Sequence, residues 1–238
     1  MILPKANDAI HRAWMYRILT AVSDEPVLNG RLGFKGGTCA TMRGLLDRFS
    51  VDLDFDLLDA ANLSLVKNNF EKIFKKLGLE IADCSKQSAQ YFLKYKNKNT
   101  ERNTLKIDCN FPIPKSNQYE MVRIPEIDRI LNCQTVPTMF ANKLIAVSDR
   151  YTRNRSIAGR DIFDIHAFFL KGFEVNEKVI QEKTGKSVAE YFKFLAEFIK
   201  QNVTQSIIDE DLNHLLPVAE FKSIRKGLKQ EVLAFLRI

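Results

Sequence analysis

Alternating apolar and polar residues predict strands in the first half of the chain. Residues 50–57 read SVDLDFDL, which places the apolar side chains on one face and three aspartates on the other. Residues 103–111 alternate in the same way, so Asp108 falls on a polar strand face. Two further strands are expected at 31–35 and 89–96, and the polar segment 97–102 is expected to be the turn of a hairpin.

Other segments carry apolar residues at helical spacing. Residues 7–22 and 60–77 are predicted helices, the first capped by Asn7 or Asp8 and the second ending at Gly78. A short helix is expected at 39–47. After Pro137 the pattern is helical throughout, with helices expected at 138–150, 158–171, 175–183, 187–202, 204–215 and 217–236.

These elements together predict an α+β fold. A small mixed sheet flanked by helices would be followed by a C-terminal helical bundle. The change of pattern near residue 135 predicts an α/β domain at 1–135 and a helical domain at 136–238.

Composition narrows the class of protein. The 238 residues are 45% hydrophobic and 27% charged, which is typical of a globular protein, and the net charge of +7 suggests a polyanionic partner. The four cysteines form no zinc-binding spacing. The start MILPKANDAIHRAW lacks the apolar core of a signal peptide, and no apolar run approaches the roughly 18 residues that span a bilayer. We therefore expect a soluble, cytoplasmic protein with no membrane partner.

The aspartates of residues 50–57 indicate metal chemistry. Like charges on one strand face repel, so stability alone does not favour the pattern. Asp52 and Asp54 project to the same side and can hold the same metal pair, Mg²⁺ or Mn²⁺, and Asp108 on another strand is the candidate third carboxylate that would complete a two-metal site. Asp56 is expected to lie at a frayed, exposed strand end. The alternative is that the aspartates only form the exposed face of an antiparallel sheet.

A turn with almost no side chains precedes these acids. Gly36 and Gly37 allow the backbone to approach a triphosphate, and the start of the following helix offers free N–H groups. Thr38 adds a hydroxyl. A glycine pair alone more often marks an ordinary turn, so the combination with the acidic strand is what favours a nucleotide site.

The helical half contains two charged patterns. Lys143 and Arg150 lie two turns apart on one helix face, and Arg160 precedes Asp164 by one turn on the next helix. Taken alone, these residues could form a solvated basic face and a local ion pair.

The combined motifs resemble a known family. A glycine-pair turn followed by a DxD strand resembles the nucleotidyltransferase superfamily. The finer pattern, GGT followed by RFSVDLDF, is similar to the AbiEii/AbiGii toxin family, which also carries a KLxAxxxR helix and an RDxxD helix. Both occur here, at 143–150 and 160–164, so the resemblance covers roughly residues 30–170. Small departures occur at Cys39, Ala40 and Val51.

The resemblance implies an activity and a set of roles. Members are toxins of type IV toxin–antitoxin or abortive-infection systems, paired with a cognate antitoxin. The implied reaction is metal-dependent transfer of NMP from an NTP to RNA, in particular tRNA. Lys143 would contact the phosphates, and Asp161 or Asp164 would compete with Asp108 for the role of general base. Arg48 and Arg160 would bind phosphate or only orient the acids. The full nucleotide-binding set is Lys35, Gly36, Gly37, Thr38, Arg48, Ser50, Lys143, Arg150 and Arg160.

The basic residues favour RNA as the acceptor. One basic cluster lies on the hairpin, and another lies between the two motif helices. Such charges can also serve solubility alone. Two other functions stay open: a non-catalytic nucleotide- or RNA-binding module, and transfer to a small molecule or a protein hydroxyl. The intact acids argue against the first, and the basic clusters against a cationic small molecule. The clusters are Lys94, Lys96, Lys98, Arg102 and Lys106, and Arg150, Arg153, Arg155 and Arg160.

Overall fold

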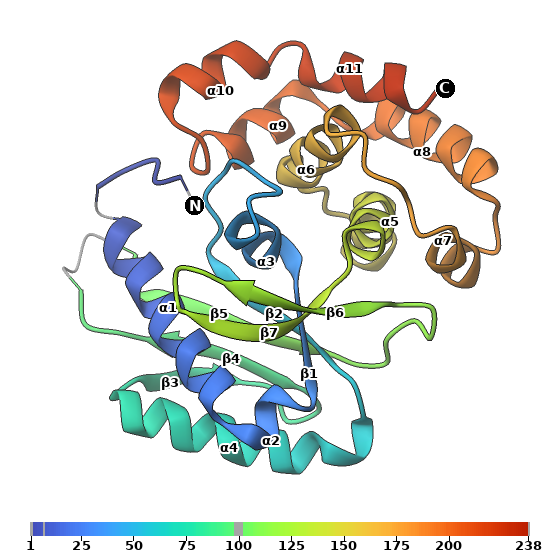
Figure 1. Cartoon of the computed structure of the whole chain (residues 1–238). Helices are drawn as coiled ribbons and strands as arrows, with labels where there is room; N and C mark the ends of the chain where they lie inside the picture. Colours follow the sequence, from blue (N-terminus) through green and yellow to red (C-terminus); the bar gives the residue numbers. More distant parts are fainter. Residues whose placement is uncertain (1, 7, 98–101, 238) are drawn as a thin grey trace.

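The fold is seen in a computed structural model that describes residues 2–6, 8–97 and 102–237 (Figure 1). Three expectations fall wholly or partly outside these residues. They are the cap Asn7, the hairpin turn 97–102 and the position of Lys98 in the first basic cluster.

A seven-stranded mixed sheet forms the centre of the molecule. Its order is β3-β4-β5-β2-β1-β7-β6, and the pairs β1/β7 and β2/β5 are parallel while the other pairs are antiparallel. The strands are β1 Leu32–Lys35, β2 Asp52–Leu57, β3 Glu80–Cys84, β4 Ala89–Lys94, β5 Thr104–Asn110, β6 Tyr119–Ile124 and β7 Arg129–Gln134.

The four strands predicted by alternation are confirmed as β1, β2, β4 and β5, but three strands were missed. All five residues of β3 are exposed, and most of β6 is exposed or half-buried, because both lie at the sheet edges. An edge strand that buries little shows no alternation of apolar and polar residues. The sheet is therefore larger than the one predicted.

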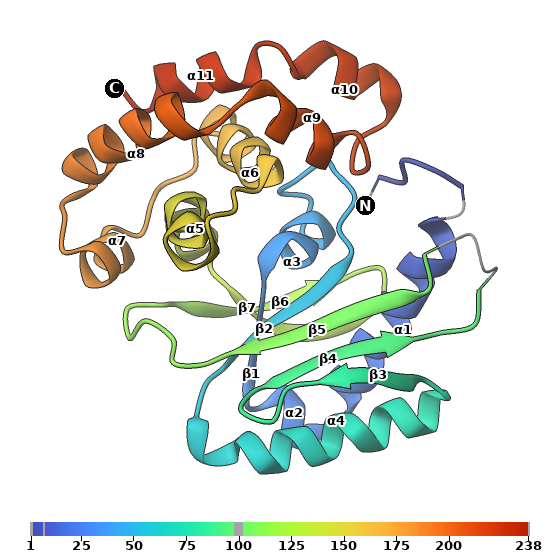
Figure 2. The same cartoon turned by 180° about the vertical axis from the view of Figure 1, so that it is seen from behind.

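Helices cover both faces of the sheet. On one face lie α1 (Asp8–Asp24), α2 (Pro26–Asn29) and α4 (Leu63–Leu77), which follows a 3₁₀ turn at Ala60–Asn62. Phe70 and Phe74 of α4 pack against Tyr91 of β4 at ring-centroid distances of 6.0 and 5.0 Å. The opposite face carries α3 (Gly36–Met42) and the helices of the C-terminal half (Figure 2). The α+β fold class is confirmed.

From Val136 onward the described chain is helical. The predicted single helix at 217–236 is wrong, because α10 ends at Ile224 and α11 begins at Leu228, after Gly227 at its N-cap. Glycine has low helix propensity, which favours the break. The strands end at Gln134, while the division into two domains at residue 135 stays a prediction. The helices are α5 Val136–Asn154, α6 Gly159–Leu170, α7 Glu177–Thr184, α8 Val188–Asn202, α9 Gln205–Leu212, α10 Val218–Ile224 and α11 Leu228–Phe235.

Within the described part of the chain, none of the helices has the length and apolar character that crossing a bilayer requires.

Candidate active site

The sheet register brings the predicted acids together. Parallel pairing of β2 with β5 places Asp54 directly beside Asp108 and Asp52 beside Lys106. Neighbouring strands lie about 4.8 Å apart, so the three carboxylates share one small region of a single sheet face. Asp52, Asp54 and Asp108 all line one polar cavity of about 360 Å³.

This concentration of negative charge affects Asp54 most. Burial, and then the charges of Asp52 and Asp108, raise the pKa of the Asp54 carboxyl, while Lys35 opposes the rise. A bound cation would stabilise the ionised form of such a carboxylate.

The glycine turn packs directly against the acids. Gly36 has a φ of 78°, and a Cβ atom added there would collide with the side chain of Asp54. A Cβ atom on Gly37 would likewise collide with the guanidinium of Arg48. Because glycine permits this close approach, α3 begins at Gly36, directly after β1, and not at residue 39 as predicted.

Thr38 and Ser50 connect α3 to the acidic strand. The Thr38 hydroxyl contacts the Ser50 hydroxyl at 2.8 Å and the backbone carbonyl of Asp52, and Thr38 is fully buried. Thr38 thus holds α3 against the start of β2, and we expect it to meet a nucleotide only through its backbone.

The prediction that Asp56 lies at a frayed, exposed strand end is wrong. Asp56 is 1% exposed, because β2 lies between β1 and β5 and the strand does not fray. The carboxylate accepts hydrogen bonds from Lys35 Nζ at 2.6 Å, Tyr119 Oη at 2.7 Å and Gln134 Nε2 at 2.5 Å. Asp56 therefore anchors Lys35 beside the site, through partners on strands that the sequence pattern did not reveal.

Lys106 is a site residue that sequence reasoning did not assign to the site. Its Nζ atom lies 2.6 Å from Asp108 Oδ2, and the same oxygen accepts a hydrogen bond from Gln90 Nε2 at 3.2 Å. Asp108 is thus held by a lysine and an amide. Among the described residues, no group of three or more His, Cys, Asp or Glu side chains is arranged so that it could hold a metal ion, and Asp108 is accordingly paired with Lys106. The alternation of 103–111 already placed Lys106 and Asp108 on one face.

The two aspartates of the RDxxD motif, Asp161 and Asp164, form ion pairs with lysine and arginine side chains. Asp164 is fully buried and binds Arg48 Nε and Nη2 at 2.6 and 2.7 Å, and Lys143 Nζ at 2.6 Å. Burial alone would raise the pKa of Asp164, but Arg48 and Lys143 outweigh it and hold that pKa well below its usual range. Asp161 lies 3.6 Å from Lys143 and 3.3 Å from Arg150.

These contacts bear on the choice of general base among Asp108, Asp161 and Asp164. A carboxylate whose pKa is strongly depressed is a poor proton acceptor, and both oxygens of Asp164 already hold cations. Arg48 uses its third nitrogen, Nη1, to donate to the Phe49 carbonyl at 2.9 Å, and it is 2% exposed. These contacts argue against Asp164 as the base and fit an orienting role for Arg48 and Asp164, so Asp108 and Asp161 stay the candidates.

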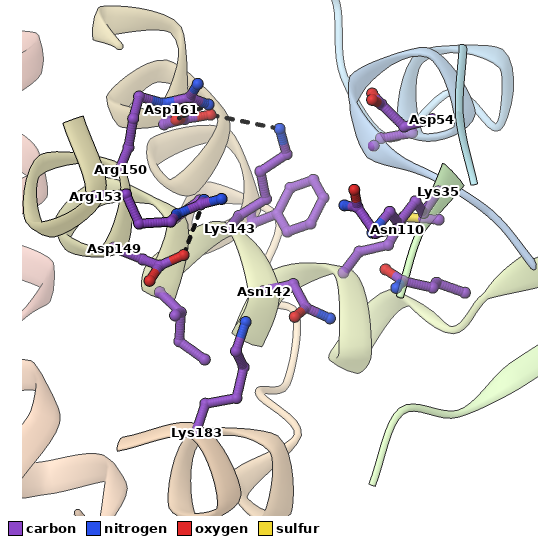
Figure 3. Close-up of a pocket in the computed structure, with 17 residues that line it drawn as sticks. Lys35, Asp54, Asn110, Asn142, Lys143, Asp149, Arg150, Arg153, Asp161 and Lys183 are labelled. Carbon is purple, nitrogen blue, oxygen red and sulfur yellow. Dashed lines mark hydrogen bonds and ion pairs between the residues drawn. The ribbon is translucent and has the colours of Figure 1, made fainter. Parts of the chain in front are cut away.

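Two adjoining cavities form the cleft. The polar cavity also includes the side chains of Lys143, Arg150, Arg153 and Arg160, which suit phosphate groups. A second cavity of about 220 Å³ shares Asp54, Asn110 and Lys143 with the first. Figure 3 shows Lys143 between Asp54, Lys35 and Asn110 on one side and Asp149, Arg150 and Arg153 on the other.

The second cavity has a mixed lining. Met139, Ile145 and Ala146 supply apolar surface, and Asn142 supplies an amide. Apolar walls with a few polar groups are typical of sites that bind an organic ring. The cleft as a whole can therefore accommodate a nucleotide with its phosphates among the cations.

Comparison with known proteins agrees with this geometry. A family model described as "Nucleotidyl transferase AbiEii toxin, Type IV TA system" matches residues 17–234. A comparison with curated proteins found no match.

Solved structures share the fold. JHP933 from Helicobacter pylori is 21% identical, with a TM-score of 0.59 over 99% of this chain and 92% of that one. A putative nucleotidyltransferase from H. pylori is 19% identical, with a TM-score of 0.59 over 98% of this chain and 94% of that one. MenT4, the nucleotidyltransferase toxin Rv2826c from Mycobacterium tuberculosis H37Rv, is 18% identical, with a TM-score of 0.56 over 97% and 84%.

Proposed function

The chain belongs to the AbiEii nucleotidyl transferase toxin family of type IV toxin–antitoxin systems, and from this premise we propose that it transfers NMP from an NTP to an RNA acceptor. The proposed acceptor is tRNA, the proposed metal is Mg²⁺ or Mn²⁺, and a cognate antitoxin is the proposed regulatory partner. Because NTPs and tRNA are found in the cytoplasm, the proposed location of the reaction is the cytoplasm.

The observation that carries the proposal is the pairing of Asp54 with Asp108 beside Asp52. Three carboxylates on one sheet face border a cavity that is also lined by Lys143 and Arg150 of α5 and by Arg160 of α6. Carboxylates for a metal and cations for phosphates are the two groups that nucleotidyl transfer requires.

The donor set suits a hard divalent cation. Asp52 and Asp54 offer only oxygen atoms, which Mg²⁺ and Mn²⁺ prefer. Burial first, and then the charge of Asp52, raises the pKa of Asp54, and a cation would offset both effects. Asp52 and Asp54 would hold the metal, with Asp108 as the third candidate. When bound, the metal supplies charge neutralisation for the phosphate oxygens.

The protein's own residues perform the remaining steps. The acceptor hydroxyl oxygen bonds to the α-phosphorus, and its proton passes to Asp108. The bond between the α-phosphorus and the bridging oxygen breaks, and pyrophosphate leaves with the bonding electrons. Lys143, Arg150 and Arg160 hold the phosphates by charge.

The basic surroundings support RNA as acceptor. Lys106 and Arg153 join the cations already named around the polar cavity, in a chain of net charge +7. Such a concentration of cations favours a polyanion over a cationic small molecule.

The proposal is tested by nucleotide transfer in vitro. The protein is incubated with Mg²⁺, each α-labelled NTP in turn and total bacterial tRNA, beside an Asp52→Ala/Asp54→Ala variant. Label in tRNA that is lost in the variant is expected. Label confined to protein or to small molecules, or label in tRNA that persists in the variant, would contradict the proposal.

A further inference from the structure

One face of β4 and β5 is open beside the acids. Tyr91 and Leu93 are buried on the side of α4, and the alternate residues Gln90, Phe92 and Lys94 lie on the opposite face with Asp108. No side chain of this open face belongs to the hydrophobic core of the described residues. The face extends the floor of the polar cavity, which already includes Gln90 and Lys106.

Phe92 is an unexplained residue of this face. It is partly exposed, it lies outside the hydrophobic core, and its ring makes no aromatic or cation contact with another described residue. Most of its surface is covered, but the covering comes from outside the hydrophobic core, and part of the ring stays open to solvent on the face that carries Asp108. Its position therefore points to a ligand.

The register fixes where Phe92 lies relative to the acids. Phe92 pairs across the strands with Lys106, and Lys106 pairs with Asp52. Two strand spacings separate the backbones of Phe92 and Asp52 by about 10 Å. Gln90, in the next row, donates to Asp108 itself. An acceptor nucleotide whose hydroxyl lies at Asp108 would extend its base, or that of its neighbour, towards Phe92.

Cations lie on the same sheet face as the Phe92 ring. Lys106 lies across from it, and Lys94 lies two residues further along the same face. Lys96 and Arg102, both exposed, follow at the end of the two strands. An aromatic platform between cations recognises single-stranded nucleic acid, because the ring stacks on a base while the cations bind phosphates.

We propose that Phe92 is a stacking platform for a base of the single-stranded 3′ end of the acceptor RNA, with Lys94 and Lys106 binding its phosphates. This inference rests on the proposed function, because it names the surface that presents the acceptor to Asp108.

The test measures binding of RNA without relying on catalysis. Two 5′-fluorescein RNA hairpins are used, one with a four-nucleotide single-stranded 3′ end and one blunt, and fluorescence anisotropy gives the Kd for the full-length protein. Phe92→Ala should raise the Kd for the overhang probe about 10-fold and leave the blunt probe unchanged. Phe92→Tyr should restore wild-type binding.

A matched control separates this site from aromatic surface in general. Phe194 on α8 is 43% exposed, and Phe194→Ala should bind both probes as the wild type does. Should Phe92→Ala fold poorly in circular dichroism, Phe92→Leu keeps apolar bulk without the ring and should lose binding to the same extent. Wild-type affinity for the overhang probe in a folded Phe92 variant, or an equal loss in Phe194→Ala, would overturn the inference.

Transfer assays separate this inference from the proposed function. A wild type that labels RNA, beside a Phe92→Ala variant with a raised KM for RNA and an unchanged KM for NTP, supports both. An unchanged KM for RNA overturns the stacking site alone. If the wild type labels no RNA, but Phe92→Ala binds the overhang probe more weakly than the wild type does, the stacking site is supported and the proposed transfer is overturned.

Discussion

Asp164 and Arg48 form a buried bidentate ion pair, with Arg48 Nε and Nη2 at 2.6 and 2.7 Å from the two carboxylate oxygens. Asp164 lies on α6, and Arg48 lies in the loop that leads into β2. Lys143 of α5 joins the same carboxylate at 2.6 Å. The pair thereby ties the motif helices to the segment that positions Asp52 and Asp54.

Removing one partner of this pair should destabilise the protein. Asp164→Ala leaves the Arg48 cation buried and without its carboxylate, so we expect a loss of about 3–5 kcal/mol in the free energy of unfolding. Urea denaturation measures this change. As a control, Arg123→Gln breaks the exposed pair with Asp128 and should leave the urea midpoint unchanged. Equal effects of the two substitutions would contradict the structural role of Asp164.

The sequence predicted on which strand faces the aspartates lie, but not which residues contact them. Alternation put Asp52, Asp54 and Asp108 on strand faces, yet only the β2/β5 register shows that Asp54 and Asp108 are neighbours, because pairing joins segments 54 residues apart. Asp56 was misjudged because Tyr119 and Gln134 lie on β6 and β7, which carry no clear alternation. The position of Phe92 outside the core could not be predicted either, since a phenylalanine in a strand usually packs in a core.

Asp54→Asn should separate stability from activity. Neutralising a carboxyl whose pKa is raised by burial and by Asp52 removes an unfavourable charge, so the metal-free protein should melt at the same temperature or higher. Nucleotide transfer should fall at least about 100-fold, because a proposed metal ligand is lost. Thermal melting and transfer assays check the two effects. A lower melting temperature together with wild-type transfer would contradict this assignment.

Metal binding should depend on the ionisation of Asp54. Because the pKa of Asp54 is raised, protonation should weaken Mn²⁺ binding at a pH above the ordinary aspartate value of 3.8, and affinity should decline as pH falls. Lys35 lowers this pKa, so Lys35→Gln should shift the midpoint of the decline to higher pH. Calorimetric titration with Mn²⁺ at several pH values measures it, with the exposed Lys200→Gln as control. A midpoint that moves to lower pH in Lys35→Gln would exclude this electrostatic account.

His11 should make stability depend on pH. Burial lowers the pKa of His11 from 6.5 to about 4, and its ring contacts Tyr95 Oη at 2.7 Å and the Val51 carbonyl at 2.8 Å. Between these two values the unfolded chain binds a proton that the folded protein does not. The free energy of unfolding should therefore fall as pH decreases from 6.5 to 4, by up to about 1.4 kcal/mol per pH unit.

Substitution isolates that contribution. His11→Gln should flatten this part of the stability profile measured by urea denaturation, whereas His214→Gln, at an exposed position, should keep the wild-type slope. An unchanged slope in His11→Gln would assign the pH dependence to other groups.

The central claim, that Asp52, Asp54 and Asp108 perform nucleotidyl transfer to RNA, is tested most directly by following the position of the label. Wild-type protein, Mg²⁺ and tRNA are incubated with NTP labelled at the α- or the γ-phosphate, beside Asp54→Asn and Asp108→Asn. The account predicts RNA labelled from the α-phosphate only, release of the γ-label in pyrophosphate, and loss of both products in the two variants. RNA labelled from the γ-phosphate, or α-label transferred equally well by Asp54→Asn, would contradict it.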